Sequence, residues 1–297
     1  MVDAVGVKKS FDGFSALDGL DMYVPRGSIY GLVGPNGAGK STILRHITGI
    51  YRQDEGDILV NGEPVYENEE IKRSIAYIPD DIFWFTQATL RDMMKYYAGI
   101  YLKFDRDRFE KLGEDFDFDD RRQMRRLSKG MQKQAAFRLC LSMRPELLVL
   151  DEPVDGLDPV MRRKMWSLIM EDVAENGTTV IVSSHNLREL EDVCDQVGIM
   201  KGGKMLLQRS LEELQENIVK VQIALPEGEK LPEDMNILHE TTTGRLHTLI
   251  LRGDSGEAEQ KLMRAHPLFM DLLPLTLEEI FIYELGGADS EVRDIVL

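Results

Sequence analysis

The hydrophobic positions of the first two thirds of the chain fall into short continuous runs. Residues 28–33, 147–150 and 179–183 form such runs, and polar or glycine-containing segments bound each of them. Residues 41–48 instead carry apolar side chains at helical spacing. Short continuous apolar runs are typical of strands that are buried on both faces of a parallel sheet. Their alternation with helical patterns predicts an α/β fold.

A different pattern begins after residue 207. Apolar residues alternate from Val219 to Leu225, as in a half-buried strand, and residues 246–251 suggest a second strand. Two helical patterns cover residues 257–266 and 276–285. We therefore expect two domains, a larger one at residues 1–207 and a small accessory α/β domain at residues 208–297.

A phosphate-binding pattern, G-x-x-x-x-G-K-[ST], directly follows the first apolar run. Its residues are Gly34, Pro35, Asn36, Gly37, Ala38, Gly39, Lys40, Ser41 and Thr42. Glycines let such a turn wrap a polyphosphate, and the backbone amides and the following helix N-terminus favour its negative charge. Lys40 can reach the terminal phosphates, and the Ser41 hydroxyl suits Mg²⁺. An ordinary glycine turn is the alternative, but the position between a strand and a helix favours binding of a nucleoside triphosphate.

Two carboxylates, Asp151 and Glu152, end the apolar run at residues 147–150. A buried parallel strand delivers the residues at its carboxyl end to the edge where such sheets bind ligands. Asp151 can hold Mg²⁺, usually through water, and Glu152 is then free to orient or deprotonate the water that attacks the γ-phosphate. A solvated strand end would explain an isolated Asp-Glu pair, but the phosphate loop upstream favours metal chemistry.

The segment Leu127-Ser128-Lys129-Gly130-Met131-Gln132 precedes a helical pattern that extends to about Met143. Ser128 is a good N-cap, and Gly130 allows close backbone approach to an anion at a positive helix end. Taken alone, the segment is a capped helix. With the phosphate loop before it and the two carboxylates after it, it resembles the signature motif of the ATP-binding-cassette (ABC) ATPases. Lys129 stands where the family usually has glycine, which is similar to cassettes paired with Gram-positive drug and peptide exporters.

The resemblance covers about two thirds of the chain and implies a P-loop NTPase cassette with a RecA-like core, an antiparallel β subdomain and a helical subdomain. It also implies roles for further residues. The segment that ends at Asp158 looks like the D-loop, which crosses the dimer interface near the nucleotide, and His185 resembles the switch histidine that contacts the γ-phosphate. Phe11 matches the aromatic residue that stacks on adenine, although Phe14 is three residues away and either ring could pack in the core.

Asp80 departs from the family pattern. The family normally has a glutamine here, after the apolar run at residues 74–78, and that glutamine touches Mg²⁺ and the attacking water. A carboxylate is a stronger Mg²⁺ ligand than an amide, but it adds negative charge beside the triphosphate and Glu152. We expect Asp80 to bind the metal and the enzyme to remain active, because the other catalytic positions are intact.

Composition limits the possible partners. The formal net charge of -16 argues against nucleic-acid binding, which needs a basic face. Four arginines cluster at residues 121–126, but aspartates at residues 115–120 precede them, so we expect a self-neutralising surface. Cys140 and Cys194 belong to no metal-ligand cluster and are expected to be buried, reduced thiols of a cytoplasmic protein.

The sequence has no signal peptide and no apolar run that approaches the ~20 residues of a membrane helix. We expect no direct membrane insertion, so a membrane role must come through a partner. Phe83, Trp84 and Phe85 follow the Asp80 loop, and in ABC transporters this region forms the groove that receives a coupling helix of the membrane subunit. Exposed aromatic side chains would suit that groove, and packing inside the helical subdomain is the alternative.

By this resemblance, the chain is the ATP-hydrolysing subunit of an ABC-2-type exporter of drug or peptide-like cargo. Two cassettes, identical or different, are expected to bind ATP head to tail, each ATP lying between one phosphate loop and the Ser128–Gly130 helix start of the other. A separate integral membrane permease would hold them at the cytoplasmic face of the membrane. One alternative is a soluble ABC ATPase that acts on DNA or ribosomes. This chain shows neither the long coiled coils of the DNA-repair members nor the second cassette of the translation members. The other is a regulatory module with weak hydrolysis, at which only Asp80 and Lys129 hint.

Overall fold

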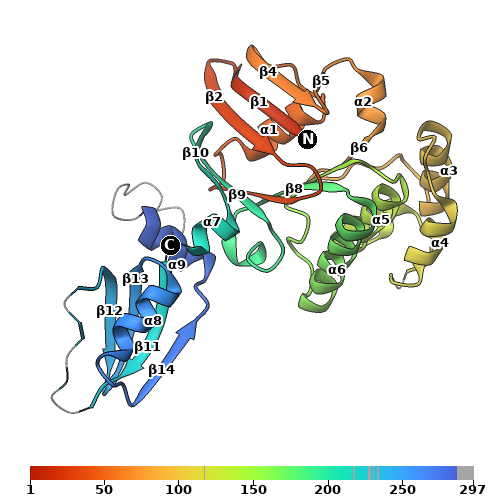
Figure 1. Ribbon diagram of the computed structural model, residues 1–297. Coiled ribbons are helices and arrows are strands. Elements are labelled where there is room, and N and C mark those ends of the chain that lie inside the picture. Colours follow the sequence, from red (N-terminus) through yellow and green to blue (C-terminus); the bar gives the residue numbers. More distant parts are fainter. Residues whose placement is uncertain (117, 217, 227–228, 230, 233, 286–297) are drawn as a thin grey trace. The chain divides into compact units, whose positions relative to one another are not determined.

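The computed structural model of the chain describes residues 1–116, 118–216, 218–226, 229, 231–232 and 234–285. These residues form two compact units (Figure 1). The first contains Met1–His185 and Val193–Gln208. The second contains the short segment Asn186–Asp192 and the described residues from Arg209 onward.

An antiparallel sheet begins the first unit, with strand order β2-β1-β4-β5. Its strands are β1 (Val2–Phe11), β2 (Phe14–Val24), β4 (Glu55–Val60) and β5 (Glu63–Pro64). Buried apolar residues of β1, β2 and β4 form one face of this sheet, and Leu17 and Leu20 of β2 share a core with Leu32 of the central sheet and Leu44 of the following helix. The shared core fixes this sheet against the elements that carry the phosphate loop.

The central sheet of the first unit has the strand order β10-β9-β3-β8-β7-β6. Its strands are β3 (Ile29–Val33), β6 (Ile75–Ile78), β7 (Leu147–Asp151), β8 (Thr179–Ser184), β9 (Gln196–Lys201) and β10 (Lys204–Ser210). β3 pairs in parallel with β8 and β9, and β7 pairs in parallel with β6 and β8. Since β8 lies between β3 and β7, their three carboxyl ends meet at one edge. This confirms the predicted α/β fold.

Helices of the first unit are α1 (Lys40–Ile47), α2 (Glu69–Arg73), α3 (Leu90–Ile100), α4 (Arg106–Gly113), α5 (Lys129–Ser142) and α6 (Pro159–Asn176), with a 3₁₀ turn at Met124–Arg126. α3, α4 and α5 pack together on one side of the sheet (Figure 1). Arg138 of α5 is buried there, and its guanidinium lies 3.9 Å from the centre of the Phe109 ring.

The aspartates before the arginine cluster do not neutralise it as predicted. Asp120 pairs with Arg138 and Arg91, and Asp115 pairs with Lys164. Asp117 lies outside the described residues. The prediction was wrong for Asp115 and Asp120 because the fold brings basic residues from distant helices closer to them than their neighbours in sequence.

The second unit is built on an antiparallel sheet of order β12-β13-β11-β14. Its elements are α7 (Leu211–Glu216), β11 (Ile218–Ala224), β12 (Ile237–Thr243), β13 (Leu246–Arg252), α8 (Ser255–Met263), β14 (Phe269–Leu273) and α9 (Leu277–Leu285). The alternating residues Val219, Val221 and Ile223 pack against Leu262 of α8. The two predicted strands are therefore confirmed, and each predicted helix begins within two residues of its expected position.

The second unit also includes a 3₁₀ turn at Leu187–Glu189, which begins two residues after His185 in the chain. Two guanidinium nitrogens of Arg188, Nε and Nη2, donate to the Glu278 carboxylate at 3.1 and 2.8 Å. The Leu277 amide donates to Glu191 at 3.0 Å. Helix α9 thus holds a segment that the sequence pattern assigned to the first domain.

Candidate functional site

The phosphate loop joins β3 to α1 and lines a cavity of about 260 Å³. Residues 35–42 line one side of the cavity, and its other lining residues are Phe14, Ala16, Asp80 and Glu152. Gly39 has φ 105°, and a Cβ there would lie 2.7 Å from the Ala16 carbonyl oxygen, so only glycine fits at the start of α1. The amides at the N-terminus of α1 and the Lys40 ammonium give the cavity the character of an anion site.

Lys40, Glu152 and His185 meet at the edge of this cavity. The Lys40 ammonium donates to the Gly34 carbonyl oxygen at 2.6 Å and lies 3.4 Å from Glu152 Oε1. The other carboxylate oxygen of Glu152, Oε2, lies 2.9 Å from His185 Nδ1. Glu152 has φ 48°, a region that non-glycine residues rarely adopt, and such strain is concentrated at functional sites. The parallel order of β3, β8 and β7 brings these residues together.

Asp151 precedes this cluster and is almost fully buried. The Ser183 hydroxyl donates to Asp151 Oδ1 at 2.7 Å and accepts the amide N–H of Glu152 at 3.0 Å. Ser183 therefore orients both carboxylate residues, and sequence reasoning did not identify it. Within the described residues, no group of three or more His, Cys, Asp or Glu side chains is arranged to hold a metal ion. An ion here would take its remaining ligands from water and phosphate oxygens, which is the usual mode of Mg²⁺ binding.

Asp80 lies at the cavity, as its predicted role requires, but its carboxylate also has a protein partner. Lys133 Nζ lies 3.4 Å from Asp80 Oδ1 and donates to the carbonyl oxygens of Glu152, at 2.7 Å, and Asp155, at 3.1 Å. Sequence reasoning missed Lys133. The available signal was a lysine in a helix where most of the surrounding residues are apolar. An ammonium group buried there needs several acceptors.

Comparison with known proteins agrees with this geometry. The family described as ABC transporter matches residues 17–155. The ABC transporter ATP-binding protein YtrB of Bacillus subtilis is 31% identical over 288 residues, which cover 97% of this chain and 99% of that protein. The chain belongs to the ATP-binding proteins of ABC transporters. It is therefore an ATP-binding subunit and an ATP hydrolase, as the resemblance implied.

Two further likenesses support the family. The Nod factor export ATP-binding protein I of a Rhizobium species is 34% identical over 75% of this chain and 75% of that protein. A solved structure of an ATP-binding subunit of an ABC transporter superposes with a TM-score of 0.67 at 26% identity, and covers 72% of this chain and 92% of that chain. The ABC cassette fold expected from the sequence is confirmed.

The two aromatic residues near the adenine position of this ABC ATPase differ in their surroundings. Among the described residues that line the phosphate-loop cavity, Phe14 is present and Phe11 is not. Phe11 is 38% exposed and lies edge-on to Tyr51, with 5.5 Å between the ring centres, while Phe14 is 66% exposed. The structure brings Phe14 to the phosphate-loop cavity, and adenine stacking on Phe11 stays a prediction.

The signature and D-loop residues of the ABC ATPase are helix caps in the single chain. The Ser128 hydroxyl accepts the Met131 amide at 3.2 Å, which confirms it as the N-cap of α5. The Asp158 carboxylate accepts the amides of Val160 and Met161, each at 3.0 Å, and caps α6. Ser128, Gly130 and Asp158 are not among the described residues that line the phosphate-loop cavity. Their predicted contact with nucleotide is thus not made within one chain.

The aromatic segment after Asp80 divides into buried and exposed side chains. Trp84 is only 4% exposed and donates its indole N–H to Gln132 of α5 at 3.1 Å, so the prediction of a surface role is wrong for Trp84. Phe83 is 78% exposed with Arg125 above its ring at 6.0 Å, and Phe85 is 47% exposed beside Tyr96. Trp84, the central residue of the three, packs against α5, because its side chain is the one of the three that carries a hydrogen-bond donor for Gln132.

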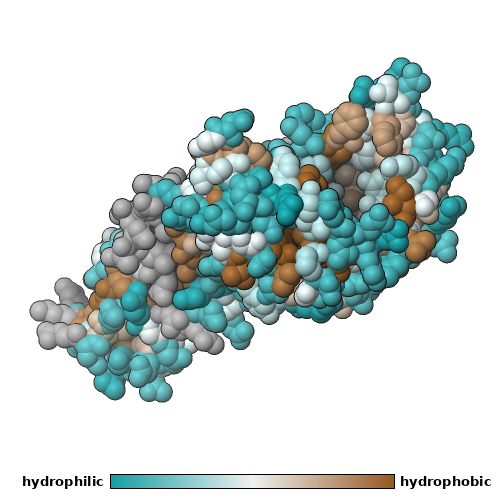
Figure 2. Space-filling view, turned by 90° about the horizontal axis from the view of Figure 1, so that it is seen from above, coloured by the Kyte–Doolittle hydropathy of each residue, from teal (hydrophilic) through white to brown (hydrophobic). Residues whose placement is uncertain are grey.

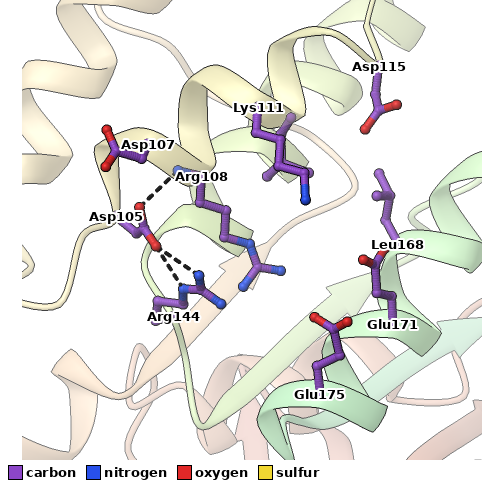
Figure 3. Close-up of a pocket in the computed structure, with 10 residues that line it drawn as sticks. Asp105, Asp107, Arg108, Lys111, Asp115, Arg144, Leu168, Glu171 and Glu175 are labelled. Carbon is purple, nitrogen blue, oxygen red and sulfur yellow. Dashed lines mark hydrogen bonds and ion pairs between the residues drawn. The ribbon is translucent and has the colours of Figure 1, made fainter.

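A second cavity of about 340 Å³ lies between α4 and α6, away from the phosphate loop (Figure 3). Arg108 and Lys111 line one side, and Glu171 and Glu175 line the other across an open space. Asp105 accepts hydrogen bonds from the Arg144 guanidinium at its rim. None of the described residues that line this cavity belongs to the predicted nucleotide site.

Proposed function

We propose that this ABC ATPase hydrolyses ATP between two cassettes and drives export through a separate membrane subunit. The observation that carries the proposal is the separation of the phosphate loop from the Ser128–Gly130 helix start within one chain. In a single chain, the cavity lined by the phosphate loop is open, and Ser128 at the start of α5 is exposed. A second cassette, placed head to tail, supplies the missing helix N-terminus to the same triphosphate.

The chemistry follows from the residues at the carboxyl ends of β7 and β8. We assign Glu152 as the base that orients and deprotonates the attacking water, which then breaks the bond between the γ-phosphorus and the β–γ bridging oxygen. Lys40 leaves its hydrogen bond to Gly34 and its contact with Glu152 to bind the β- and γ-phosphates. His185 holds the Glu152 carboxylate in place and can donate to a γ-phosphate oxygen.

The residues at the site fit Mg²⁺ bound together with ATP. Ser41 at the start of α1 and the Asp151 carboxylate at the end of β7 are oxygen donors, and Mg²⁺ prefers such donors. When bound, the ion neutralises negative charge on the transferring phosphoryl group. Asp80 is a third candidate oxygen donor at this cavity.

A trapped dimer tests the head-to-tail proposal. Glu152→Gln protein with ATP should elute as a dimer in size-exclusion chromatography with light scattering, and nucleotide-free protein should elute as a monomer. In the same background, Ser128→Arg should abolish the dimer and retain ATP binding by the monomer, because Ser128 lies outside its own phosphate-loop cavity. A dimer that persists in the Ser128→Arg variant would contradict the arrangement.

The proposed contact with the membrane subunit is the exposed ring pair Phe83 and Phe85, together with Tyr96 and the neighbouring Arg125. Hydrophilic side chains cover most of the face seen in Figure 2, with small apolar patches between them. An exposed aromatic pair beside an arginine suits a cytoplasmic helix of the permease that carries apolar and acidic residues. Within the described residues, no helix is both long and apolar enough to cross a membrane.

Export is the direction we propose, because a relative named for Nod factor export aligns over three quarters of the chain. Through its permease, the ATPase would then act at the cytoplasmic face of the membrane. Co-expression with a candidate membrane subunit from a neighbouring gene provides the test: wild-type protein should co-purify with that subunit in detergent. A Phe83→Ser/Arg125→Glu variant should not, with its basal ATPase activity retained. Equal recovery of both proteins would contradict the contact.

A further inference from the structure

Lys133 occupies a position that connects three parts of the nucleotide site. It lies in α5, the helix that begins at Ser128, and its side chain is only 8% exposed. An ammonium group has three N–H donors. Each has an acceptor here, since the nitrogen contacts the carbonyl oxygens of Glu152 and Asp155 and the carboxylate of Asp80.

The positive charge of Lys133 lies beside a cavity that is lined by negatively charged side chains. Asp80 and Glu152 both line the cavity, and a bound triphosphate adds several more negative charges. Lys40 lies against Glu152, whereas Lys133 lies against Asp80. The Asp80 side chain is 56% exposed toward the cavity, so a contact with Lys133 reduces its repulsion of an incoming phosphate group.

The two carbonyl contacts have a separate consequence. Glu152 has the unusual φ of 48°, and its carbonyl oxygen receives the shortest of the three Lys133 hydrogen bonds. The Asp155 carbonyl oxygen, three residues later, receives another. Lys133 thereby ties the two ends of the turn that sets the direction of the Glu152 side chain.

We propose that Lys133 is a positioning residue of ATP hydrolysis, which fixes the Glu152–Asp155 turn and compensates the charge of Asp80 beside the triphosphate. The part concerning the turn rests on the role proposed for Glu152. The part concerning charge does not, because it predicts ATP affinity in the absence of turnover. The two parts can therefore fail separately.

The charge compensation predicts effects of opposite sign for the two members of the pair. Lys133→Gln leaves the Asp80 carboxylate uncompensated, so ATP binding measured in EDTA should weaken by about three- to tenfold, within the usual coupling of neighbouring residues. Asp80→Asn leaves the Lys133 ammonium uncompensated, so ATP should bind more tightly. The double variant Asp80→Asn/Lys133→Gln removes both charges and should return the affinity to near the wild-type value.

Equilibrium binding of a fluorescent ATP analogue to purified full-length protein measures these affinities, and thermal melting checks that each variant is folded. Lys164→Gln is the matched control, because Lys164 of α6 pairs with Asp115 outside the site. Should Lys133→Gln fail to fold, Asp80→Asn still decides the matter. An unchanged or weaker affinity of Asp80→Asn, or a double variant that binds ATP as weakly as Lys133→Gln alone, would overturn the charge compensation.

Turnover with Mg²⁺-ATP then tests the turn. The double variant lacks the ammonium that ties Glu152 to Asp155, so its kcat should remain at least about tenfold below wild type although its ATP affinity has recovered. Lys133→Arg keeps the charge and the donors and should recover part of kcat. A double variant with wild-type kcat would show that Lys133 does not position Glu152, whether or not Glu152 is the base.

Discussion

His185 lies against the carboxylate of Glu152, with Nδ1 2.9 Å from Oε2. The two residues are far apart in the sequence, but they follow adjacent parallel strands, β7 and β8. Lys40 approaches the other carboxylate oxygen of Glu152 from the phosphate loop at 3.4 Å. One carboxylate thus contacts both basic residues that the sequence predicted for γ-phosphate binding, and this arrangement makes Glu152 the most informative position for mutation.

Glu152→Gln should retain ATP binding and lower kcat by orders of magnitude. The amide keeps the size of the side chain and leaves the phosphate loop unchanged, but it cannot accept a proton from water. Phosphate release under saturating Mg²⁺-ATP measures kcat, and equilibrium dialysis measures binding. Glu175→Gln, in the cavity between α4 and α6, is the control for loss of a carboxylate elsewhere. Equal kcat in Glu152→Gln and wild type would sink the assignment.

The adenine contact can be assigned by comparing two alanine variants. If Phe11 stacks on adenine, as the sequence predicts, Phe11→Ala should weaken ATP binding by about 1 kcal/mol or more, while Phe14→Ala has a smaller effect. If Phe14 is the residue that contacts adenine, Phe14→Ala should weaken ATP binding more than Phe11→Ala. Phe14 lines the cavity, whereas Phe11 contacts Tyr51. We expect Phe11→Ala to be the weaker binder, because Phe11 holds the position that resembles the adenine-stacking aromatic residue of the family, and its ring is 38% exposed. Titration with ATP and with inorganic triphosphate separates adenine from phosphate contacts.

Trp84 and Phe83 should respond oppositely to the same substitution. Trp84→Ser removes a ring that is 4% exposed and leaves Gln132 without its indole donor, so unfolding free energy should fall by about 3–5 kcal/mol. Phe83→Ser replaces a ring that is 78% exposed and should change the unfolding free energy by less than about 0.5 kcal/mol. Urea denaturation followed by circular dichroism compares the two variants. A stable Trp84→Ser protein would show that this ring is dispensable for the fold.

The two cysteines should resist alkylation over a wide pH range. Both thiols are free and buried, as the sequence predicted, and burial raises the pKa of Cys140 to about 12 and that of Cys194 further. An exposed thiol reacts about twentyfold faster at pH 9 than at pH 7, because its thiolate fraction rises through a pKa near 8.5. Native protein should show no such increase with iodoacetamide, measured by mass spectrometry. Guanidinium-unfolded protein should be labelled at both positions, and rapid labelling of native protein at pH 9 would contradict the burial.

Local patterns in the sequence were enough to predict the elements that hold the nucleotide. The apolar run before Gly34 predicted a buried strand, and the glycines and Lys40 that follow indicated a turn around phosphate. The carboxylates after residue 150 could be placed at the same sheet edge because parallel strands end together. Ser128 could be recognised as an N-cap from its type and position alone. In each case the determining interaction lies within a few residues of the chain.

Only the tertiary structure decided the pairings between distant segments. Asp80 pairs with Lys133 of α5, and Asp120 pairs with Arg138 of α5 and Arg91 of α3. Trp84 is buried because α5 presents Gln132 to it, while its neighbour Phe83 remains exposed. These contacts depend on how helices pack on the sheet, and the energy of a buried charge or ring depends on which groups surround it in space. A sequence shows which residues carry charge or apolar surface, whereas packing determines which of them meet.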